Sequence, residues 1–298
     1  MAHSHEHNHE HSHEVNPKTI RYLFIAFIIN MLLTVVELVA GFLAGSIALV
    51  GDALHNTSDA FSILIAIIAY KIGTKKATNR YSYGFKRAET IGGFVNLILL
   101  FISGCYLLFE GVSKIITPEE INGWAIIIVS ILALIIDSAT AKLSHTDSGH
   151  NTNMKMLFLH NLADALGSVG VIVSGLFVVF LGWSFVDGVI AVMIAIYMIV
   201  QSVLSFSGIV DILMDAAPQQ LDTEEIKSAL KKLSGVRDVA HMHLWSINEN
   251  ELGFDCHIIG DNTQVAQDVQ KVLSEKFGIH HCTVQVDKDK ACVKCSLS

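Results

Sequence analysis

The sequence predicts a multi-pass α-helical membrane domain with six transmembrane helices, followed by a cytosolic α+β domain at the C-terminus. Of the 298 residues, 52% are hydrophobic and only 16% are charged, and the mean hydropathy is +0.51. Soluble domains carry about 25% charged residues on average. The apolar residues are also gathered into long segments, whereas residues 215–298 are a normal polar mixture.

Six segments lack Asp, Glu, Lys and Arg: 22–36, 38–51, 90–109, 121–136, 165–186 and 188–210. A helix needs about 20 mostly apolar residues to cross the hydrocarbon core of a bilayer. With their polar ends, these segments become predicted spans at about 20–43, 46–71, 88–114, 122–143, 155–181 and 184–212. We therefore expect a disordered His-rich tail over 1–19, a transmembrane domain over 20–214 and a cytosolic domain over 215–298.

The basic residues near the spans gather on one side of this arrangement, and the positive-inside rule assigns that side to the cytosol. They are Lys18, Arg21, Lys71, Lys75, Lys76, Arg80, Lys86, Arg87, Lys142 and Lys155. The other side has only Lys114, with Glu119 and Glu120. Both termini are therefore expected in the cytosol.

One seven-residue motif occurs twice inside this apolar sequence. Residues 54–60 read LHNTSDA and residues 159–165 read LHNLADA, so both match L-H-N-x-x-D-A. The copies lie in the second and fifth predicted spans, which is consistent with two halves of three spans each. Repeated halves around a site at the midplane are the usual plan of a transporter.

Residues i and i+4 share a helix face, so each copy aims an imidazole and a carboxylate in one direction. Facing copies would supply His55, Asp59, His160 and Asp164 as a tetrahedral set suited to Zn²⁺. The alternative is four structural polar residues, each satisfied within its own helix. Ionisable residues inside membrane spans are costly and usually mark function, and the repetition also favours the metal site.

The ligand types predict which metals bind and how binding is coupled to protons. Imidazole favours Zn²⁺ over harder ions such as Mn²⁺, while ligand type alone leaves Cd²⁺ and Co²⁺ open. A bound metal needs neutral His and ionised Asp, so metal and protons compete for the same site. If that site opens alternately to each side, inward proton movement can drive Zn²⁺ out of the cytosol.

Three further acidic residues lie within the spans. Glu37 either lines the pathway or is buried as a neutral, hydrogen-bonded acid. Asp52 lies about one turn from His55 and could accept the second N–H of that imidazole, an arrangement common around metal-bound His. Asp137, near the end of the fourth span, is an ionisable group to which the sequence assigns no role.

The first residues alternate His with Ser, Glu or Asn, at His3, His5, His7, His9, His11 and His13. Such a tail cannot build a core. It either captures metal weakly through neutral imidazoles or is dispensable. Matches to H-E-x-x-H within it are by-products of the alternation, because that motif needs a formed helix.

The C-terminal domain alternates helical and strand patterns. Helices are expected over 223–233, with Thr223 as the cap, and over 264–277; strands are expected over 236–247, 252–259 and 279–287. This order predicts a small sheet with helices on one face. Four of the five cysteines lie here, at Cys256, Cys282, Cys292 and Cys295, which favours free thiols over a disulfide framework.

Several motifs together resemble the cation diffusion facilitators, a family of six-span metal/proton antiporters, and their zinc-transporting branch in particular. They are ELVAG at 37–41, GSIAL at 45–49, residues 52–59, YGFKRAE at 83–89, residues 160–167 and HMHLW at 241–245. The resemblance covers the chain from about residue 20. It implies that His55, Asp59, His160 and Asp164 form the transport site.

The resemblance also implies a metallochaperone-like fold for the C-terminal domain, a homodimer, and a bacterial inner (plasma) membrane location. It suggests a second, regulatory zinc site, for which His241, His257 and Asp287 match the relatives and Cys292 and Cys295 are the less certain part. From the residues alone, the histidines could equally be surface residues of strands and the two cysteines a loose tail.

The sequence departs from the family in three ways. The His-rich stretch is at the N-terminus instead of between spans 4 and 5, and loop 71–87 has no ligands for a second metal. Asp137 stands where relatives often have Asn.

Arg87 and Asp215 occupy positions that resemble a charge interlock of the family at the cytosolic surface. We therefore expect an ion pair between them, either local or across the two subunits.

The predicted function is therefore secondary active export of Zn²⁺, or of Cd²⁺ or Co²⁺, in exchange for protons. The protein is expected not to be an enzyme, and to interact with the bilayer and a second copy but with no nucleic acid or nucleotide. An ATP-driven pump would need G-x-x-x-x-G-K-[ST], and an intramembrane protease would need H-E-x-x-H within a span; the sequence has neither. The alternative is a membrane zinc receptor or sensor that binds the metal without moving it.

Overall fold

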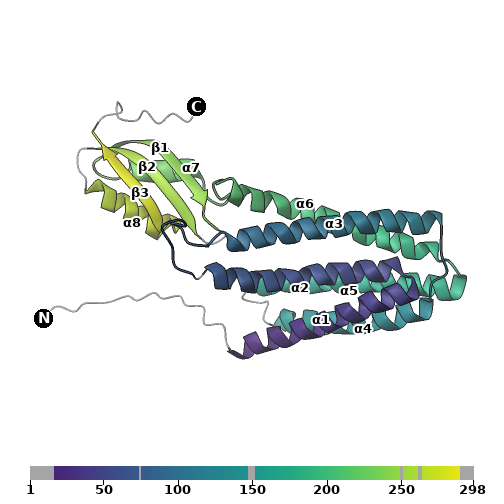
Figure 1. The fold of residues 1–298 in the computed structure, drawn as a ribbon. Helices are drawn as coiled ribbons and strands as arrows, with labels where there is room; N and C mark the ends of the chain where they lie inside the picture. The colour runs from purple at the N-terminus through teal and green to yellow at the C-terminus, as the bar shows by residue number, and fades with distance from the viewer. Residues whose placement is uncertain (1–16, 74, 147–151, 249–250, 261–263, 289–298) are drawn as a thin grey trace. The chain divides into compact units, whose positions relative to one another are not determined.

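The structure, a computed structural model, describes residues 17–73, 75–146, 152–248, 251–260 and 264–288 (Figure 1). Within some of the helices, the side chains of further residues, including 17–27 and 152–161, also lie outside the description. The chain forms two compact units. The first comprises residues 1–60 and 106–196, and the second comprises residues 61–105 and 197–298.

Six long helices lie at the positions of the six predicted spans. They are α1 (Pro17–Ala44), α2 (Ile47–Gly73), α3 (Ala88–Ile116), α4 (Gly123–Thr146), α5 (Thr152–Leu181) and α6 (Phe185–Leu213). Within the first unit, α4 packs against both α5 and α1 (Figure 1).

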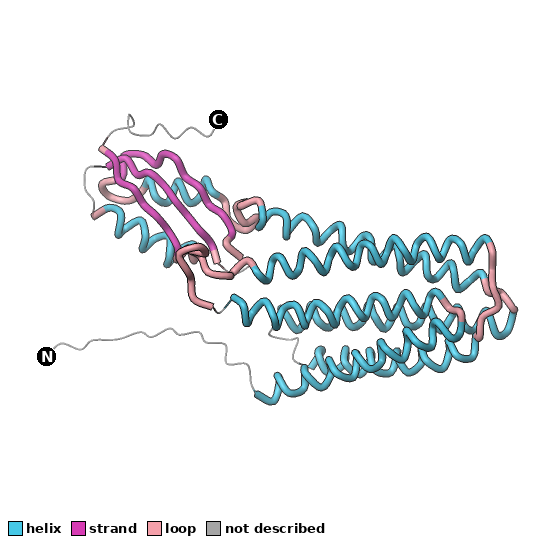
Figure 2. Tube along the Cα trace, viewed as in Figure 1, coloured by secondary structure: helices cyan, strands magenta, loops and turns pink. Residues whose placement is uncertain are grey.

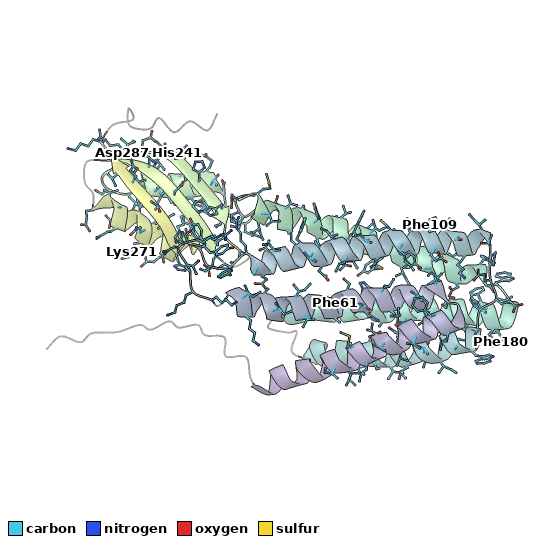
Figure 3. All side chains as sticks on the ribbon, in the orientation of Figure 1. Phe61, Phe109, Phe180, His241, Lys271 and Asp287 are labelled. Carbon is cyan, nitrogen blue, oxygen red and sulfur yellow. The ribbon has the colours of Figure 1, made fainter. Side chains whose placement is uncertain are left out.

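The helices expose large apolar side chains. Phe109 is 74% exposed and Phe180 is 73% exposed, and both are labelled on the helices in Figure 3. Among the described residues, Ala88–Ile116, Leu162–Leu181 and Phe185–Leu213 are long and apolar enough to cross a membrane, and Met31–Ala44 and Gly123–Ala139 are shorter apolar helices. Exposed apolar residues on this scale suit contact with lipid, since a soluble monomer rarely shows them.

Glycines allow two helix pairs of the first unit to approach closely. A Cβ on Gly175 of α5 would lie 3.2 Å from the carbonyl oxygen of Gly123 on α4. A Cβ on Gly188 of α6 would lie 2.7 Å from the carbonyl oxygen of Gly111 on α3. Small residues at such crossings let membrane helices pack by backbone contact.

Asp187, near the start of α6, caps the start of α2 from outside that helix. Its carboxylate accepts hydrogen bonds from the hydroxyl of Ser46 and from the backbone N–H groups of Ile47 (2.7 Å) and Ala48 (3.2 Å). The hydroxyl of Ser174 on α5 also donates to it, at 3.1 Å. The first N–H groups of a helix have no partner inside it, so Asp187 fixes the start of α2 against α5 and α6.

The C-terminal domain follows the predicted order of elements (Figure 2). Its elements are α7 (Thr223–Lys231), β1 (Val236–Ser246), β2 (Leu252–Gly260), α8 (Val265–Phe277) and β3 (His281–Asp287). The strand order is β1-β2-β3, with β1 and β2 antiparallel and β2 and β3 parallel. Because α8 lies between the parallel strands β2 and β3 in sequence, it provides the crossover that such a pair requires.

The domain has a core of its own between the helices and the sheet. The core joins Ile226 and Leu230 of α7 and Leu273 of α8 to Phe254 and Ile258 of β2. Because α7 and α8 also contact each other, both cover one face of the sheet, as predicted.

The predicted cap of α7 was wrong by one residue. The N-cap is Asp222, whose carboxylate accepts the backbone N–H of Glu224 at 2.8 Å, and Thr223 is already the first helical residue. Both residue types are good caps, so the local sequence did not distinguish them.

Two ion pairs in the second unit connect the segment before α3 to residues further along the chain. Arg87 pairs with Asp215, as expected from the sequence, and Lys86 pairs with Glu251.

Candidate metal centre

Two helices present the ligands of the predicted membrane site. His55 and Asp59 lie one turn apart on α2, and Asp164 lies on α5. His55 is only 5% exposed, whereas Asp59 and Asp164 are half-buried. The four-residue spacing of the motif therefore does place an imidazole and a carboxylate on one face of α2.

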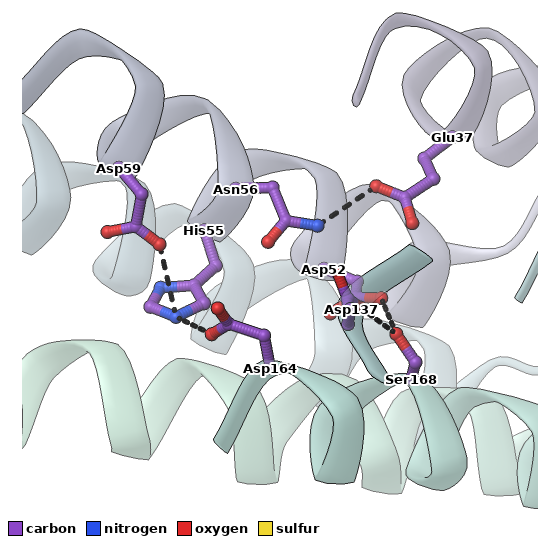
Figure 4. Close-up of polar contacts among 8 residues, drawn as sticks. All are labelled: Glu37, Asp52, His55, Asn56, Asp59, Asp137, Asp164 and Ser168. Atoms are coloured by element: carbon purple, nitrogen blue, oxygen red, sulfur yellow. Dashed lines mark hydrogen bonds and ion pairs between the residues drawn. The ribbon is translucent and has the colours of Figure 1, made fainter. Parts of the chain in front are cut away.

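The three side chains converge (Figure 4). The Nε2 atom of His55 lies 3.2 Å from Oδ1 of Asp164 and 3.6 Å from Oδ2 of Asp59. One ligand atom from each residue lies within 4.8 Å of the others. Among the described residues, only these three bring ligand atoms this close together. The donors are one nitrogen and two oxygens, a set that suits Zn²⁺.

The fourth predicted ligand, His160, is on α5 one turn before Asp164. Its side chain lies outside the described residues, so its assignment stays a prediction. The His-rich residues 1–16 and the cysteines Cys292 and Cys295 also lie outside the described residues.

Further polar residues of α1, α2 and α5 lie near this group and are buried or half-buried (Figure 4). The amide of Asn56 donates to Oε2 of Glu37 at 3.1 Å. Asp52, which we expected beside the imidazole of His55, accepts a hydrogen bond from the hydroxyl of Ser168 on α5.

A second group of ligand types lies on the sheet of the C-terminal domain. The Nδ1 atom of His257 on β2 is 2.9 Å from Oδ2 of Asp287 on β3, and the rings of His257 and His241 on β1 are 5.3 Å apart, centroid to centroid. Figure 3 labels His241 and Asp287 on this sheet. Hydrogen bonds from Gln285 and His257 hold the pKa of the Asp287 carboxyl below its usual value.

His243 also belongs to this second group, although the sequence did not indicate it as a ligand. The Nε2 atom of His243 lies 3.0 Å from Nε2 of His241. His241 has a φ of 44°, rare for a residue other than glycine. It is the extra residue of a β-bulge, because Ala240 pairs with His257 and Met242 pairs with Cys256. β-Bulges change the direction in which side chains point and are common near functional sites. In the sequence, only the H-x-H spacing of His241 and His243 indicated that these two residues could act together.

Comparison with known proteins places the chain in one family. Residues 23–214 match the model described as "Cation efflux transmembrane domain", and residues 218–289 match "Cation efflux protein, cytoplasmic domain". The first of these covers more than half of the chain. The family membership confirms a membrane domain followed by a cytoplasmic domain, and it confirms a transporter rather than an enzyme.

Bacterial relatives match nearly the whole chain. A cadmium, cobalt and zinc/H(+)-K(+) antiporter of Bacillus velezensis is 29% identical over 96% of this chain and 92% of its own length. The zinc transporter ZitB of Escherichia coli is 30% identical over 96% of this chain and 93% of its own. A solved metal-bound C-terminal domain of the CzcD transporter from Cuprividus metallidurans is 22% identical over 22% of this chain and 99% of that chain, with a TM-score of 0.22.

The transmembrane match, the matching cytoplasmic domain and relatives that align along nearly the full length lead to one conclusion. This chain belongs to the cation efflux family of membrane transporters.

Proposed function

We propose that the protein exports Zn²⁺ from the cytosol in exchange for protons, with His55, Asp59, His160 and Asp164 as its metal ligands. The observation that carries the proposal is the convergence of one imidazole and two carboxylates from α2 and α5, inside the membrane domain of a cation efflux protein. Relatives named as a zinc transporter and as a cadmium, cobalt and zinc antiporter support this choice of metal.

The contacts between the ligands support exchange with protons. The Nε2 atom of His55 lies within reach of both Asp164 and Asp59, so a proton on Nε2 would be shared with these carboxylates. A metal ion bound to the same atoms must displace that proton, because only neutral imidazole and ionised carboxylate act as ligands. Protons arriving from outside would in turn release the metal there.

A receptor that binds zinc without moving it is not favoured. The family transports cations, and the relatives that align over nearly the whole chain carry the names of transporters and antiporters.

The direct test measures metal flux across a sealed membrane. Proteoliposomes that contain the purified protein and a fluorescent zinc indicator are expected to take up Zn²⁺ when an outward proton gradient is imposed. Uptake should stop when a protonophore collapses the gradient. Zinc binding to the protein with no flux under either condition would instead support the receptor.

We further propose a homodimer whose cytoplasmic domain carries a regulatory zinc site at His241, His257 and Asp287, with Cys292 and Cys295 as additional ligands. His243 joins this group, because its imidazole contacts that of His241. The lowered pKa of the Asp287 carboxyl keeps it ionised near neutral pH, as a metal ligand must be. Zinc would then favour whichever arrangement of the two cytoplasmic domains completes its coordination.

Calorimetry on the full chain can separate this second site from the membrane site. A chain with Asp59→Ala and Asp164→Ala is expected to keep zinc binding in its cytoplasmic domain. Adding His241→Ala and His257→Ala should remove that binding, because both imidazoles are lost. His280→Ala is a matched control, since His280 is exposed and bonds only Ser274 among the described contacts. If the chain with Asp59→Ala and Asp164→Ala binds no zinc, the domain is a dimerisation module only. If binding is unchanged after all four substitutions, zinc binds elsewhere and the site at His241 and His257 is wrong.

A further inference from the structure

Two buried carboxyl groups in the membrane domain meet at one hydroxyl. The Oγ atom of Ser168 on α5 lies 3.3 Å from Oδ2 of Asp52 on α2 and 3.2 Å from Oδ2 of Asp137 on α4 (Figure 4). Asp52 is 3% exposed, Asp137 is 4% exposed and Ser168 is fully buried. None of the three residues belongs to the proposed metal ligands.

A serine hydroxyl has one proton, so it can donate to only one of these carboxylates at a time. If both acids were ionised, the second carboxylate would receive no donation from Ser168, and two buried like charges would repel each other. If one acid carries a proton, it donates to Ser168, and Ser168 donates to the other. One added proton therefore allows both carboxyl groups to form a hydrogen bond with Ser168 at the same time.

A third carboxyl group faces the pair from α1. Glu37 is fully buried, and one oxygen accepts from Asn56. Its other oxygen, Oε1, has no hydrogen-bond partner among the described residues, and Figure 4 shows the Glu37 carboxyl extending from α1 toward Asp52 and Asp137. A buried carboxylate oxygen without a donor is costly, whereas a protonated acid avoids the buried charge.

The helix segments around these acids carry no Lys or Arg. Residues 22–70, 115–141 and 156–226 contain no Lys or Arg. The ionisable groups that face the Asp52–Asp137 pair are Glu37 from α1, His55 from α2 and Asp164 from α5. Protons are thus the positive charges that this part of the membrane domain can readily accept.

Asp52 and Ser168 lie on the same two helices as the described metal ligands, one turn away from them. Asp52 lies one turn before His55 on α2, and Ser168 lies one turn after Asp164 on α5. Compared with the metal ligands, Asp52 is therefore nearer the start of α2 and Ser168 is nearer the end of α5. These two helix ends lie together, because Ser46 before α2 and Ser174 on α5 both donate hydrogen bonds to Asp187. Because α6 starts at this end and leads into the cytoplasmic domain, this is the outer end of the helices.

We propose that Asp52, Ser168 and Asp137, together with Glu37, form a proton-binding site between the metal ligands and the outer face of the membrane. The inference rests on the proposed zinc/proton exchange and names where the exchanged protons bind first. A proton moves through the site when the Asp137 carboxyl donates to the Ser168 oxygen while the Ser168 proton passes to Asp52. That step conserves charge and returns Ser168 to its hydroxyl form.

The test combines zinc flux, proton counting and infrared spectroscopy on three full-length variants. Asp137→Asn keeps the size of the side chain but cannot exchange a proton, and Ser168→Ala removes the bridge. Ser130→Ala is the matched control, because Ser130 is a fully buried serine on α4 whose hydroxyl has no partner among the described residues. Zinc binding at fixed pH serves as the check that each variant folds.

Asp137→Asn and Ser168→Ala are expected to bind Zn²⁺ as the wild type does, to move fewer protons per zinc, and to lose the dependence of flux on outer pH. Ser168→Thr, which restores a hydroxyl, should recover that dependence, and Ser130→Ala should behave as wild type. The infrared absorption of protonated carboxylic acids should be weaker in Asp137→Asn than in the wild type, because one of the acids of the site is lost.

The measurements distinguish a failure of the proposed zinc/proton exchange from a failure of the proposed proton-binding site. If wild-type flux is independent of protons, the proposed exchange itself is wrong. If wild-type flux is proton-coupled but Asp137→Asn keeps the same protons per zinc and the same infrared band, the exchange stands and the proton site is overturned.

Discussion

Asp59→Ala or His160→Ala is expected to abolish zinc flux while the protein still inserts into the membrane. Each change removes one ligand of the proposed tetrahedral site, on α2 or on α5. Loss of a residue that merely orients a ligand already lowers metal affinity by about 10- to 100-fold, so loss of a ligand should lower it by at least about 100-fold. Flux into proteoliposomes and zinc tolerance of cells that express each variant measure the effect.

Matched substitutions show whether the loss is specific to the site. Asp211→Ala removes a carboxylate from α6 that accepts a long hydrogen bond, 3.5 Å, from the side-chain amide of Gln219. His280→Ala removes an exposed imidazole. Both should transport as the wild type does. Wild-type rates in Asp59→Ala and His160→Ala would mean that the metal site lies elsewhere.

His55→Asp is expected to change which metal is carried. The substitution replaces the imidazole nitrogen by a carboxylate oxygen at the centre of the group, where His55 lies near both Asp59 and Asp164. Oxygen-rich sites favour harder ions such as Mn²⁺, and imidazole favours Zn²⁺. Competition between Zn²⁺, Cd²⁺ and Mn²⁺ in the flux assay should show a weaker preference for Zn²⁺ and a gain for Mn²⁺.

His55→Ala is the companion variant, since it removes the nitrogen without adding an oxygen. It should lose transport of all three metals, whereas His55→Asp should retain some. If His55→Asp keeps the wild-type order of metals, the imidazole of His55 does not determine selectivity.

The helices and the membrane-site motif were predictable because each depends on residues close together in sequence. The absence of charge over some 20 residues is enough to mark a span, and the i,i+4 spacing is enough to align His55 with Asp59. The convergence of Asp164 with them was expected from the repetition of the motif. In the C-terminal domain, alternation of apolar residues placed the three strands within two residues of their observed bounds.

Other features depended on contacts between elements that no local pattern encodes. Asp187 looked like an ordinary residue at the start of a span, yet it caps α2 from α6. The bulge at His241 depends on the pairing of β1 with β2, and it brings His243 against His241.

Local sequence patterns were enough to predict that the chain spans the membrane and that α2 and α5 each carry a His and an Asp one turn apart, because periodicity and the cost of burying charge act over short segments. The contacts of the remaining acids depend instead on how the helices pack. Asp52, Asp137 and Ser168 come from three helices, and their meeting depends on how α4 and α5 pack against each other and on the position at which Asp187 holds the start of α2. Both carboxyl groups are buried there and share the hydroxyl of Ser168 as a hydrogen-bond donor.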